Sequence, residues 1–476
     1  MVKLMMILLG VDYLRNRWRS LMTAGWLLLL IGIGVFIDAL DGALGFPITF
    51  VGWLLLIEGA LTLAVSWAGV GGQRRLRHAK GIAFVLTAAL IFEGNHHGHF
   101  ILSILIGLAF VFDGLLQATS ALVVRYRRYR VALGFAIFEI MLGVFMIQPY
   151  PTHYKGTVPY CIGAFFIFAG WNLIVLATRV RKLTSNPAVW GDASAEAASV
   201  AGDRNDKRDM QANARPTLQA REWDGPPAAD EPALTVHVWT PVGSSKAETQ
   251  WHPIVDRYIA AVDLNGVIST GHAALESPEG IYVSLYPAVE IDRSPDDFAR
   301  LLRATRENDV PGLFQPSYAI ESKAWCESTV RVRIRNYDPA RLDRFWRGYR
   351  EDTTYNLTHR NCSSSVSRAL DAALEGAAGR LYGSRAGWGA LFRMIVTPEL
   401  WVAVQVRKRA VTMAWTPGLT LDYARALSMV ADPRPYAWLK LARMALTKMR
   451  ASRRAWRDEG TLAQGGGSNA DPPARV

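Results

Sequence analysis

The stretch Asn361-Cys362-Ser363-Ser364-Ser365-Val366 decides how the C-terminal half of this chain folds and what chemistry it can carry. Apolar residues follow Cys362 at the spacing of one helix face, and they are Val366, Ala369, Leu370, Ala373 and Leu374. Asn361 has a side chain suited to capping the start of a helix, and Gly376 is suited to ending one. The sequence therefore predicts a helix that begins at Cys362.

A thiol in the first turn of a helix has chemical consequences. It lies among backbone N–H groups that have no intrahelical acceptor, at the positive end of the helix dipole. This setting favours the thiolate over the thiol and makes Cys362 a candidate nucleophile. The turn formed by Asn361 and Ser363 is a candidate cap and oxyanion-binding site. The alternative is that Cys362 is simply a small buried apolar residue.

A second stretch, Gly271-His272-Ala273-Ala274-Leu275, supplies an imidazole. Residues 267–276 have the composition of a strand, Ser277-Pro278-Glu279-Gly280 that of a turn, and residues 281–287 that of a returning strand. The sequence therefore predicts a β-hairpin that carries His272.

A Gly-His strand and its hairpin partner, followed by Asn-Cys at the start of a helix, resemble the circularly permuted papain-like superfamily. That group includes NlpC-type peptidases and relatives of lecithin:retinol acyltransferase. The resemblance covers roughly residues 233 to 376 and implies an α+β domain. It implies that Cys362 is the nucleophile and His272 the general base that later protonates the leaving group. No metal and no organic cofactor are implied.

The resemblance also implies a third polar residue that orients the imidazole. The strand after the histidine offers Ser284 for this role, with Tyr286 and Glu276 as neighbours. His359, close before Cys362, is a spare candidate, and we interpret it as a solvated loop residue. His237, on an expected strand near residue 235, is interpreted as a residue of the strand surface.

Composition separates the chain into two halves. Its 476 residues predict two or three domains, and almost every long apolar run lies in the first 180 residues. The net charge of +12 would suggest nucleic acid in a soluble protein, but Lys and Arg of a membrane protein collect in cytoplasmic loops, so no nucleic-acid partner is expected. Cys161, Cys326 and Cys362 form no disulfide framework, which fits a reducing compartment.

The first half predicts an all-α bundle of six transmembrane helices. The apolar segments lie at about 20–40, 47–68, 79–95, 98–121, 130–149 and 157–178. Lys and Arg gather in alternate connections, near residues 15–19, 74–80, 125–130 and 179–182. The positive-inside rule then places both termini in the cytoplasm, and we expect a multi-pass protein of a bacterial inner membrane.

An internal repeat runs through this bundle. The segments Gly52-Trp53-Leu54-Leu55-Leu56-Ile57-Glu58-Gly59, Gly107–Gly114 and Gly163–Gly170 share a pattern of two glycines seven residues apart. Such small residues lie on one helix face and allow close helix packing, so the repeat predicts three successive helical hairpins. This pattern, over about residues 10 to 182, resembles the HdeD family of acid-resistance membrane proteins.

Polar residues in the bundle allow more than one interpretation. Glu58 and Asp113 occupy equivalent repeat positions, where the third repeat has Ala169. With Asp38, Glu93 and Glu139 they could form a proton or cation path, or they could be protonated and hydrogen-bonded to neighbouring helices. The histidines of an outer loop could sense acid or remain solvated, and they are His96, His97 and His99, with His153 on the next loop.

The full organisation follows from these observations. We expect a six-helix membrane domain at 1–182, a flexible linker at 183–232 that lets the soluble part move, and a papain-like thiol domain at 233–384. A helical extension at 385–459, suited to a membrane surface, and a disordered tail at 460–476 complete the chain.

The expected function is that of a membrane-tethered cytoplasmic cysteine hydrolase of peptidase or amidase type, linked to acid or envelope stress. Two alternatives remain open: a lipid acyltransferase or esterase on the same Cys-His pair, and a non-catalytic HdeD-like stress protein with a binding domain. The expected partners are the lipid bilayer and a peptide or lipid acyl substrate. A homo-oligomer through the bundle is also left open.

Overall fold

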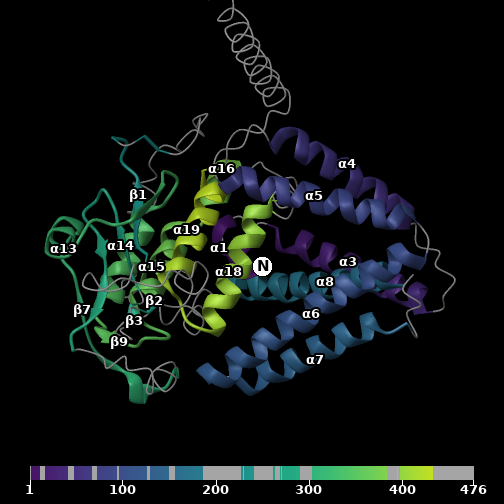
Figure 1. Ribbon diagram of the computed structural model, residues 1–476. Coiled ribbons are helices and arrows are strands. Elements are labelled where there is room, and N and C mark those ends of the chain that lie inside the picture. The colour runs from purple at the N-terminus through teal and green to yellow at the C-terminus, as the bar shows by residue number, and fades with distance from the viewer. Residues whose placement is uncertain are drawn as a thin grey trace, which may run out of the picture. The chain divides into compact units, whose positions relative to one another are not determined.

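The computed structural model describes residues 2–10, 17–40, 48–66, 72–93, 96–125, 129–149, 156–185, 227–228, 230–240, 261–262, 268–269, 271–289, 303–382, 394 and 397–432. The chain divides into a larger unit, Met1–Ile48 with Glu93–Arg434, and a smaller unit, Thr49–Phe92 with Pro435–Val476. Each unit is considered by itself. The chain is mostly helical, with long apolar helices in its first half and a small sheet region later (Figure 1).

Helices occupy all six apolar segments of the first half. They are α3 (Trp18–Leu40), α4 (Ile48–Ser66), α5 (Gly72–Glu93), α6 (His96–Val124), α7 (Tyr129–Ile147) and α8 (Thr157–Ser185). Four stretches are long and apolar enough to cross a membrane, namely Trp18–Leu40, Gly98–Val124, Tyr129–Ile147 and Thr157–Thr178. The apolar part of α4, Thr49–Ala64, is shorter, and α5 begins with a strongly basic segment.

The repeated glycines bring pairs of helices into close contact, as their spacing predicts. A Cβ atom added at Gly107 of α6 would lie 2.7 Å from the carbonyl oxygen of Gly143 in α7. One added at Gly170 of α8 would lie 2.6 Å from the carbonyl oxygen of Gly25 in α3. The closest glycine pairs are Gly59 with Gly81, Gly107 with Gly143, Gly163 with Gly32, and Gly170 with Gly25.

These contacts pair the helices differently from three successive hairpins. In the smaller unit α4 lies against α5, and in the larger unit α6 lies against α7 and α8 against α3. Each helix that carries the repeat motif therefore packs on the helix after it, and the last one returns to the first. The difference arises because the partner helices also carry small residues on the facing side, such as Gly32 and Gly143.

The second half contains a four-stranded antiparallel sheet in the order β5-β4-β1-β8. Its strands are β1 (Leu234–Trp239), β4 (His272–Glu276), β5 (Tyr282–Val283) and β8 (Val330–Ile334). The other strands are β6 (Leu285–Pro287), β7 (Val310–Phe314) and β9 (Thr354–Tyr355) in a second sheet, and the short pair β2 (Ala261–Val262) and β3 (Ile268–Ser269). The predicted hairpin that carries His272 is confirmed by the pairing of β4 with β5.

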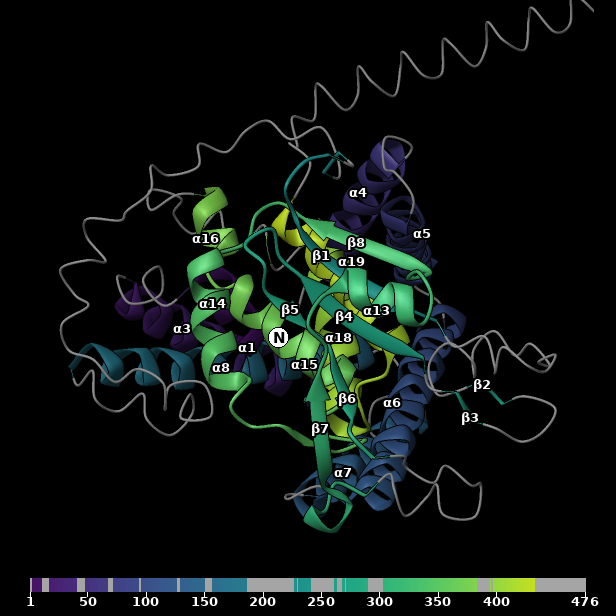
Figure 2. The same ribbon diagram turned by 90° about the vertical axis from the view of Figure 1, so that its left-hand side faces the viewer.

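Helices cover these strands (Figure 2). They are the short helix η2 (Arg306–Asn308), α13 (Tyr318–Ala324), α14 (Pro339–Tyr349), α15 (Cys362–Ala373), α16 (Ala377–Tyr382), α18 (Pro398–Thr412) and α19 (Pro417–Ala431). The helix predicted to start at Cys362 is confirmed as α15. His153 and the side chains of His96 and His97 lie outside the described residues.

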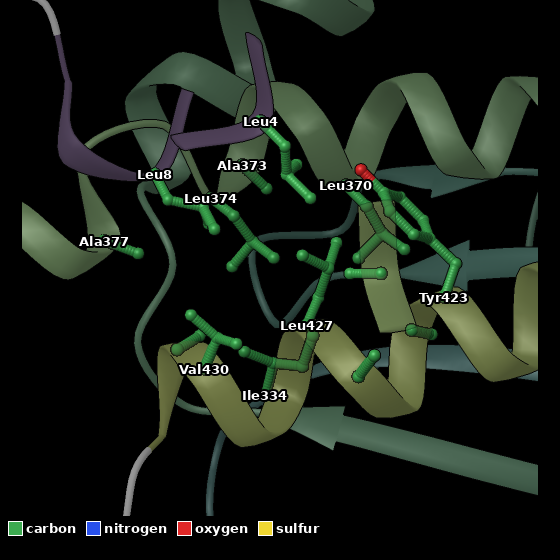
Figure 3. Close-up of a cluster of buried hydrophobic side chains, with 14 of the residues drawn as sticks. Leu4, Leu8, Ile334, Leu370, Ala373, Leu374, Ala377, Tyr423, Leu427 and Val430 are labelled. Carbon is green, nitrogen blue, oxygen red and sulfur yellow. The ribbon is translucent and has the colours of Figure 1, made fainter. Parts of the chain in front are cut away.

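The N-terminal helix α1 (Val2–Leu9) belongs to the core of the soluble half. Leu4 and Leu8 lie among side chains of α15, α16 and α19, including Leu374 and Leu427 (Figure 3). The backbone N–H of Gly376 donates to the carbonyl oxygen of Ile7 at 2.8 Å. The first residues of the chain therefore complete the hydrophobic core that α15 helps to build.

The described parts of the soluble half and of the larger unit's apolar helices share one hydrophobic cluster. It includes Leu21 of α3 and Leu176, Ala177 and Val180 of α8, together with residues of α1, α15, α18 and α19. The larger unit's apolar helices and the second half of the chain therefore share a packed core, while the flexible linker expected at 183–232 stays a prediction. Most of the segment at 183–232, the residues from 433 to 459 and the tail at 460–476 lie outside the described residues.

Candidate active site

Cys362 is the first residue of α15, and local hydrogen bonds fix that helix start. The side-chain Oδ1 of Asn361 accepts from the backbone N–H of Ser364 at 2.8 Å, and the Ser364 hydroxyl accepts from the backbone N–H of Asn361 at 2.8 Å. This reciprocal pair is a capping box. It holds Cys362, whose exposed fraction is 8%, at the positive end of the helix.

Asn361 acts as the cap and not as an oxyanion donor. Its Nδ2 donates to the carbonyl oxygens of Leu357 and Trp415, at 2.7 and 2.8 Å. The side-chain amide is thus fully used in holding the loop and the C-terminal segment. The backbone N–H groups of Cys362 and Ser363 are the first-turn donors that helix geometry leaves without an intrahelical acceptor.

His272 begins strand β4, directly after a glycine with positive φ. Gly271 has φ of +69°, a conformation that favours glycine, and it sets the direction in which β4 enters the sheet. His272 pairs with Trp239 of β1 and has an exposed fraction of 3%. α15 packs against β4, and the buried imidazole of His272 lies close enough to the thiol of Cys362 for each group to shift the pKa of the other.

The other side of the imidazole faces two oxygens. Nε2 of His272 lies 2.8 Å from the hydroxyl of Ser284 and 3.2 Å from Oε1 of Glu321. The first contact is the one expected for Ser284, but Glu321 was not expected. Since Nε2 is engaged here, Nδ1 is the ring nitrogen left for another partner.

Glu321 is a buried carboxylate held by two phenols. The hydroxyl of Tyr282 donates to Oε2 at 2.6 Å, and that of Tyr286 donates to Oε1 at 2.8 Å. The exposed fraction of Glu321 is 4%. A buried carboxylate that accepts from two hydroxyls and faces an imidazole is well suited to orient that imidazole and to stabilise its positive charge.

The pKa values shift in the direction of an ion pair. Burial opposes charge on His272, but the Cys362 thiolate and Glu321 outweigh it and raise the pKa of the imidazole to about 9. Burial also opposes the thiolate, yet His272, the backbone N–H of Ala273 and the hydroxyl of Ser363 lower the pKa of Cys362. Burial is likewise outweighed at Glu321, whose pKa falls to about 2 beside His272 and the two tyrosines. All three shifts favour a thiolate, an imidazolium and a carboxylate near neutral pH.

Aromatic rings enclose the imidazole. The ring of Tyr286 stacks on His272 with centroids 4.1 Å apart, and Trp239 and Trp325 lie at 5.4 and 6.4 Å. Trp325 is 54% exposed, so it forms an accessible apolar wall beside the buried pair. These rings limit water around the imidazole and leave a surface that apolar parts of a substrate can contact.

Other candidate residues lie away from the thiol. His237 is buried, with 2% exposed, and stacks on Tyr318, so the expectation of a strand-surface residue is wrong. Burial lowers the pKa of His237 to about 4, and its partners are Ser328 and Glu276. Glu276 therefore serves His237 and not His272. The ring of His359 lies 3.9 Å from Asp309.

Both acids of the repeat have basic partners. Glu58 in α4 lies 2.8 Å from Nζ of Lys80 in α5. Asp113 in α6 lies 2.7 Å from Nζ of Lys408 and 2.8 Å from Nη2 of Arg409, both in α18. Each acid thus bonds to a neighbouring helix, as the structural alternative expects, but its partner is a basic side chain.

Comparison with known proteins adds no assignment, since no family model, no curated protein and no solved structure matches the chain. The function has to be inferred from the geometry of the site.

Proposed function

We propose that this protein is a membrane-anchored cysteine hydrolase of papain-like type, which cleaves an amide or an ester through a thioester intermediate. The observation that carries the proposal is the buried contact of Cys362 with His272, which is backed in turn by Glu321. A nucleophile, a base and an orienting carboxylate in this order are the functional parts of a catalytic triad. Glu321 replaces Ser284 as the proposed third member, and Ser284 supports the same nitrogen.

In the proposed reaction, the Cys362 thiolate attacks the carbonyl carbon of the substrate. The oxyanion that forms is stabilised by the backbone N–H groups of the first turn of α15. His272 then gives its proton to the leaving nitrogen or oxygen, and the thioester remains. Water, deprotonated by His272, attacks the thioester and releases the acid, which restores the thiolate and the imidazolium.

We propose that the first half is a six-helix bundle of HdeD-like type in a bacterial inner membrane, with both termini cytoplasmic. Four helices long and apolar enough to cross a membrane support this setting. The basic residues at alternate connections support the orientation. A link to acid or envelope stress follows from the HdeD-like repeat.

A lipid acyl substrate is the second candidate, and one observation favours it. The hydrophobic cluster that contains Val366 and Leu370 of α15 also contains Leu176 and Val180 at one end of the apolar helix α8. The nucleophile helix and the end of a predicted span thus belong to one packed core, which favours a substrate at the membrane surface. Acyl transfer to an acceptor other than water would use the same Cys-His pair.

Trapping of the acyl-enzyme tests the proposal. The full-length protein in detergent is mixed with p-nitrophenyl esters of short and long acyl chains and with matched anilides, and the intact mass is recorded after acid quenching. We expect an adduct on Cys362 that hydroxylamine removes, since a thioester is labile to that nucleophile. Release of p-nitrophenol from the esters should likewise be slowed when His272 is replaced.

The matched control is His237→Ala, because His237 is the other buried histidine of the same sheet and does not face the thiol. We expect this variant to form the adduct at close to the wild-type rate, and His272→Ala to lose about 10²–10⁴-fold in rate. The absence of any Cys362 adduct from esters and anilides would contradict the proposed function. A lipid substrate is indicated if only the long-chain esters react.

A further inference from the structure

We infer that α18 connects the membrane helix α6 to the nucleophile helix α15, and that Asp113 is therefore a positioning residue for the thiol site. This inference rests on the proposed function, because it assigns Asp113 a role in that chemistry. The three helices belong to the larger unit. The connection consists of ion pairs made by three consecutive residues, Arg407, Lys408 and Arg409.

On the membrane side, two acids face two bases. Asp113 of α6 accepts from Lys408 and Arg409 at 2.7 and 2.8 Å, and Glu139 of α7 lies close enough to interact with it electrostatically. The side chain of Asp113 is 27% exposed. A carboxylate in an apolar span is costly unless it is paired, so α18 supplies the charge that this helix pair lacks.

The repeat explains why the charge must come from another part of the chain. Gly59 packs on Gly81, and Gly114 packs on Ala136, so Gly81 and Ala136 are equivalent positions. Lys80, just before Gly81, neutralises Glu58 within its own helix pair. The equivalent residue before Ala136 is Phe135, which cannot neutralise Asp113. Asp113, the acid of the second repeat, therefore has no base at the position equivalent to Lys80, and α18 supplies its basic partners.

On the enzyme side, Arg407 pairs with Asp371, which lies on α15 with Cys362. Tyr423 of α19 donates to Asp371 at 2.6 Å and accepts from Arg407 at 2.8 Å. A second bond joins α19 to the first turn of α15, since the hydroxyl of Thr420 donates to the carbonyl oxygen of Ser363 at 3.4 Å. These contacts hold the helix whose first turn presents the thiol.

Successive residues of a helix point about 100° apart, so Arg407 and its two basic neighbours face different sides of α18. One side holds α15, and the others hold α6 (Figures 1 and 2). Removal of the charge at Asp113 would take away the acid that bonds directly to Lys408 and Arg409 and leave Glu139 of α7 as the nearby acid. We expect α18 to shift and to carry Arg407 and α15 with it, which changes the contact between Cys362 and His272.

The first part of the test asks whether the contact exists, without using the enzyme's chemistry. The full chain in lipid nanodiscs is treated with a carbodiimide, which joins a carboxylate directly to an amine that contacts it, and the peptides are analysed by mass spectrometry. The expected product is an amide between Asp113 and Lys408, whose side-chain atoms lie 2.7 Å apart. The control is Lys408→Arg, which keeps the charge but has no amine and should give no such crosslink. Failure of the wild type to form the Asp113–Lys408 crosslink, while Glu58 and Lys80 at 2.8 Å do crosslink, would overturn the inference.

The second part measures the rate at which iodoacetamide alkylates Cys362 in the full chain at several pH values. We expect Asp113→Asn to slow alkylation below pH 7 by at least about fivefold, the low end of typical coupling between sites. Asp113→Glu should restore the rate, which distinguishes positioning from misfolding. Glu58→Gln is the matched control, because that acid is neutralised within its own helix pair, and it should leave the rate unchanged.

The outcomes separate the two proposals. If wild-type Cys362 reacts rapidly and Asp113→Asn reacts equally fast, the positioning role is wrong and the proposed function stands. If wild-type Cys362 is unreactive, the proposed function fails and the positioning role fails with it, whatever the crosslink shows. Slow alkylation of Cys362 in Asp113→Asn, together with a crosslink between α6 and α18 in the first part of the test, supports both proposals.

Discussion

At the scale of single residues, the site depends on how a buried charge is stabilised. Cys362 and His272 have exposed fractions of 8% and 3%, so neither charge is solvated well by water. Glu321 compensates, since its carboxylate lies 3.2 Å from Nε2 of His272. Ser284 is closer to the same nitrogen but is neutral, and hydrogen bonds to charged groups contribute more than those between neutral groups.

The two candidates for the third member can be separated by substitution. In Glu321→Gln we expect alkylation of Cys362 at pH 6 to fall by about 10-fold or more, because the imidazolium loses the negative charge that stabilises it. Ser284→Ala should cost less, about 3-fold or below, as the loss of one neutral hydrogen bond does. Equal effects of the two substitutions would contradict the role given to Glu321.

The pKa shifts also predict how stability depends on pH. His272, raised from 6.5 to about 9, contributes stability that is complete below pH 6.5 and is lost as the pH rises through 9. Glu321, lowered from 4.5 to about 2, contributes stability that is present above pH 4.5 and is lost as the pH falls through 2. The difference in melting temperature between the wild type and Glu321→Gln should therefore be largest between pH 4.5 and 6.5. A difference that grows above pH 9 would contradict this account.

At the scale of elements, the sequence predicted those helices and strands that are specified by neighbouring residues in the chain. The helix from Cys362 and the hairpin with His272 are confirmed because capping residues, apolar periodicity and turn residues specify them. Glu321 could not be found in this way. Its helix α13 has only seven residues, with no apolar period to follow, and its burial comes from Tyr282 and Tyr286 on other strands.

The close helix contacts predict how the bundle responds to small substitutions. Gly143 and Gly134 lie in the same helix α7, but a Cβ atom at Gly143 would lie 2.6 Å from the carbonyl oxygen of Gly107, and one at Gly134 would meet nothing within 4 Å. Gly143→Ala should therefore lower the melting temperature in detergent, whereas Gly134→Ala should leave it unchanged or raise it slightly. Equal stability of the two variants would show that α6 and α7 do not pack through these glycines.

At the scale of the whole molecule, the described contacts join distant parts of the chain in the larger unit. The sequence did not predict that α1 would lie in the core of the second half. Its partners on α15, α16 and α19 are remote in sequence, and its eight residues show no amphipathic pattern. The same limit hid the ion pairs between α18 and α6. Periodicity shows that a helix has a buried face, but it does not show which element covers that face.

The core position of α1 predicts an effect of the N-terminus on the site. Leu8 is fully buried, so Leu8→Ala in the full chain should destabilise the soluble core by about 2–5 kcal/mol. Hydrogen exchange should then rise in α16, which packs against α1, and in α15, whose Ala373 belongs to the same hydrophobic cluster. The control is Val411→Ala on α18, a side chain that is 61% exposed, where we expect little change. Unchanged exchange in α15 of Leu8→Ala would contradict the assignment of α1 to this core.

The pH dependence of Cys362 alkylation tests directly whether Cys362 and His272 form a thiolate–imidazolium pair. Full-length protein, with Cys161→Ala and Cys326→Ala, is labelled with iodoacetamide from pH 5 to pH 10 beside a His272→Ala version. We expect Cys362 to be labelled rapidly below pH 7 and to lose this reactivity without His272, because the imidazolium stabilises the thiolate. Slow labelling that rises only near the ordinary thiol pKa of about 8.5, with or without His272, would contradict it.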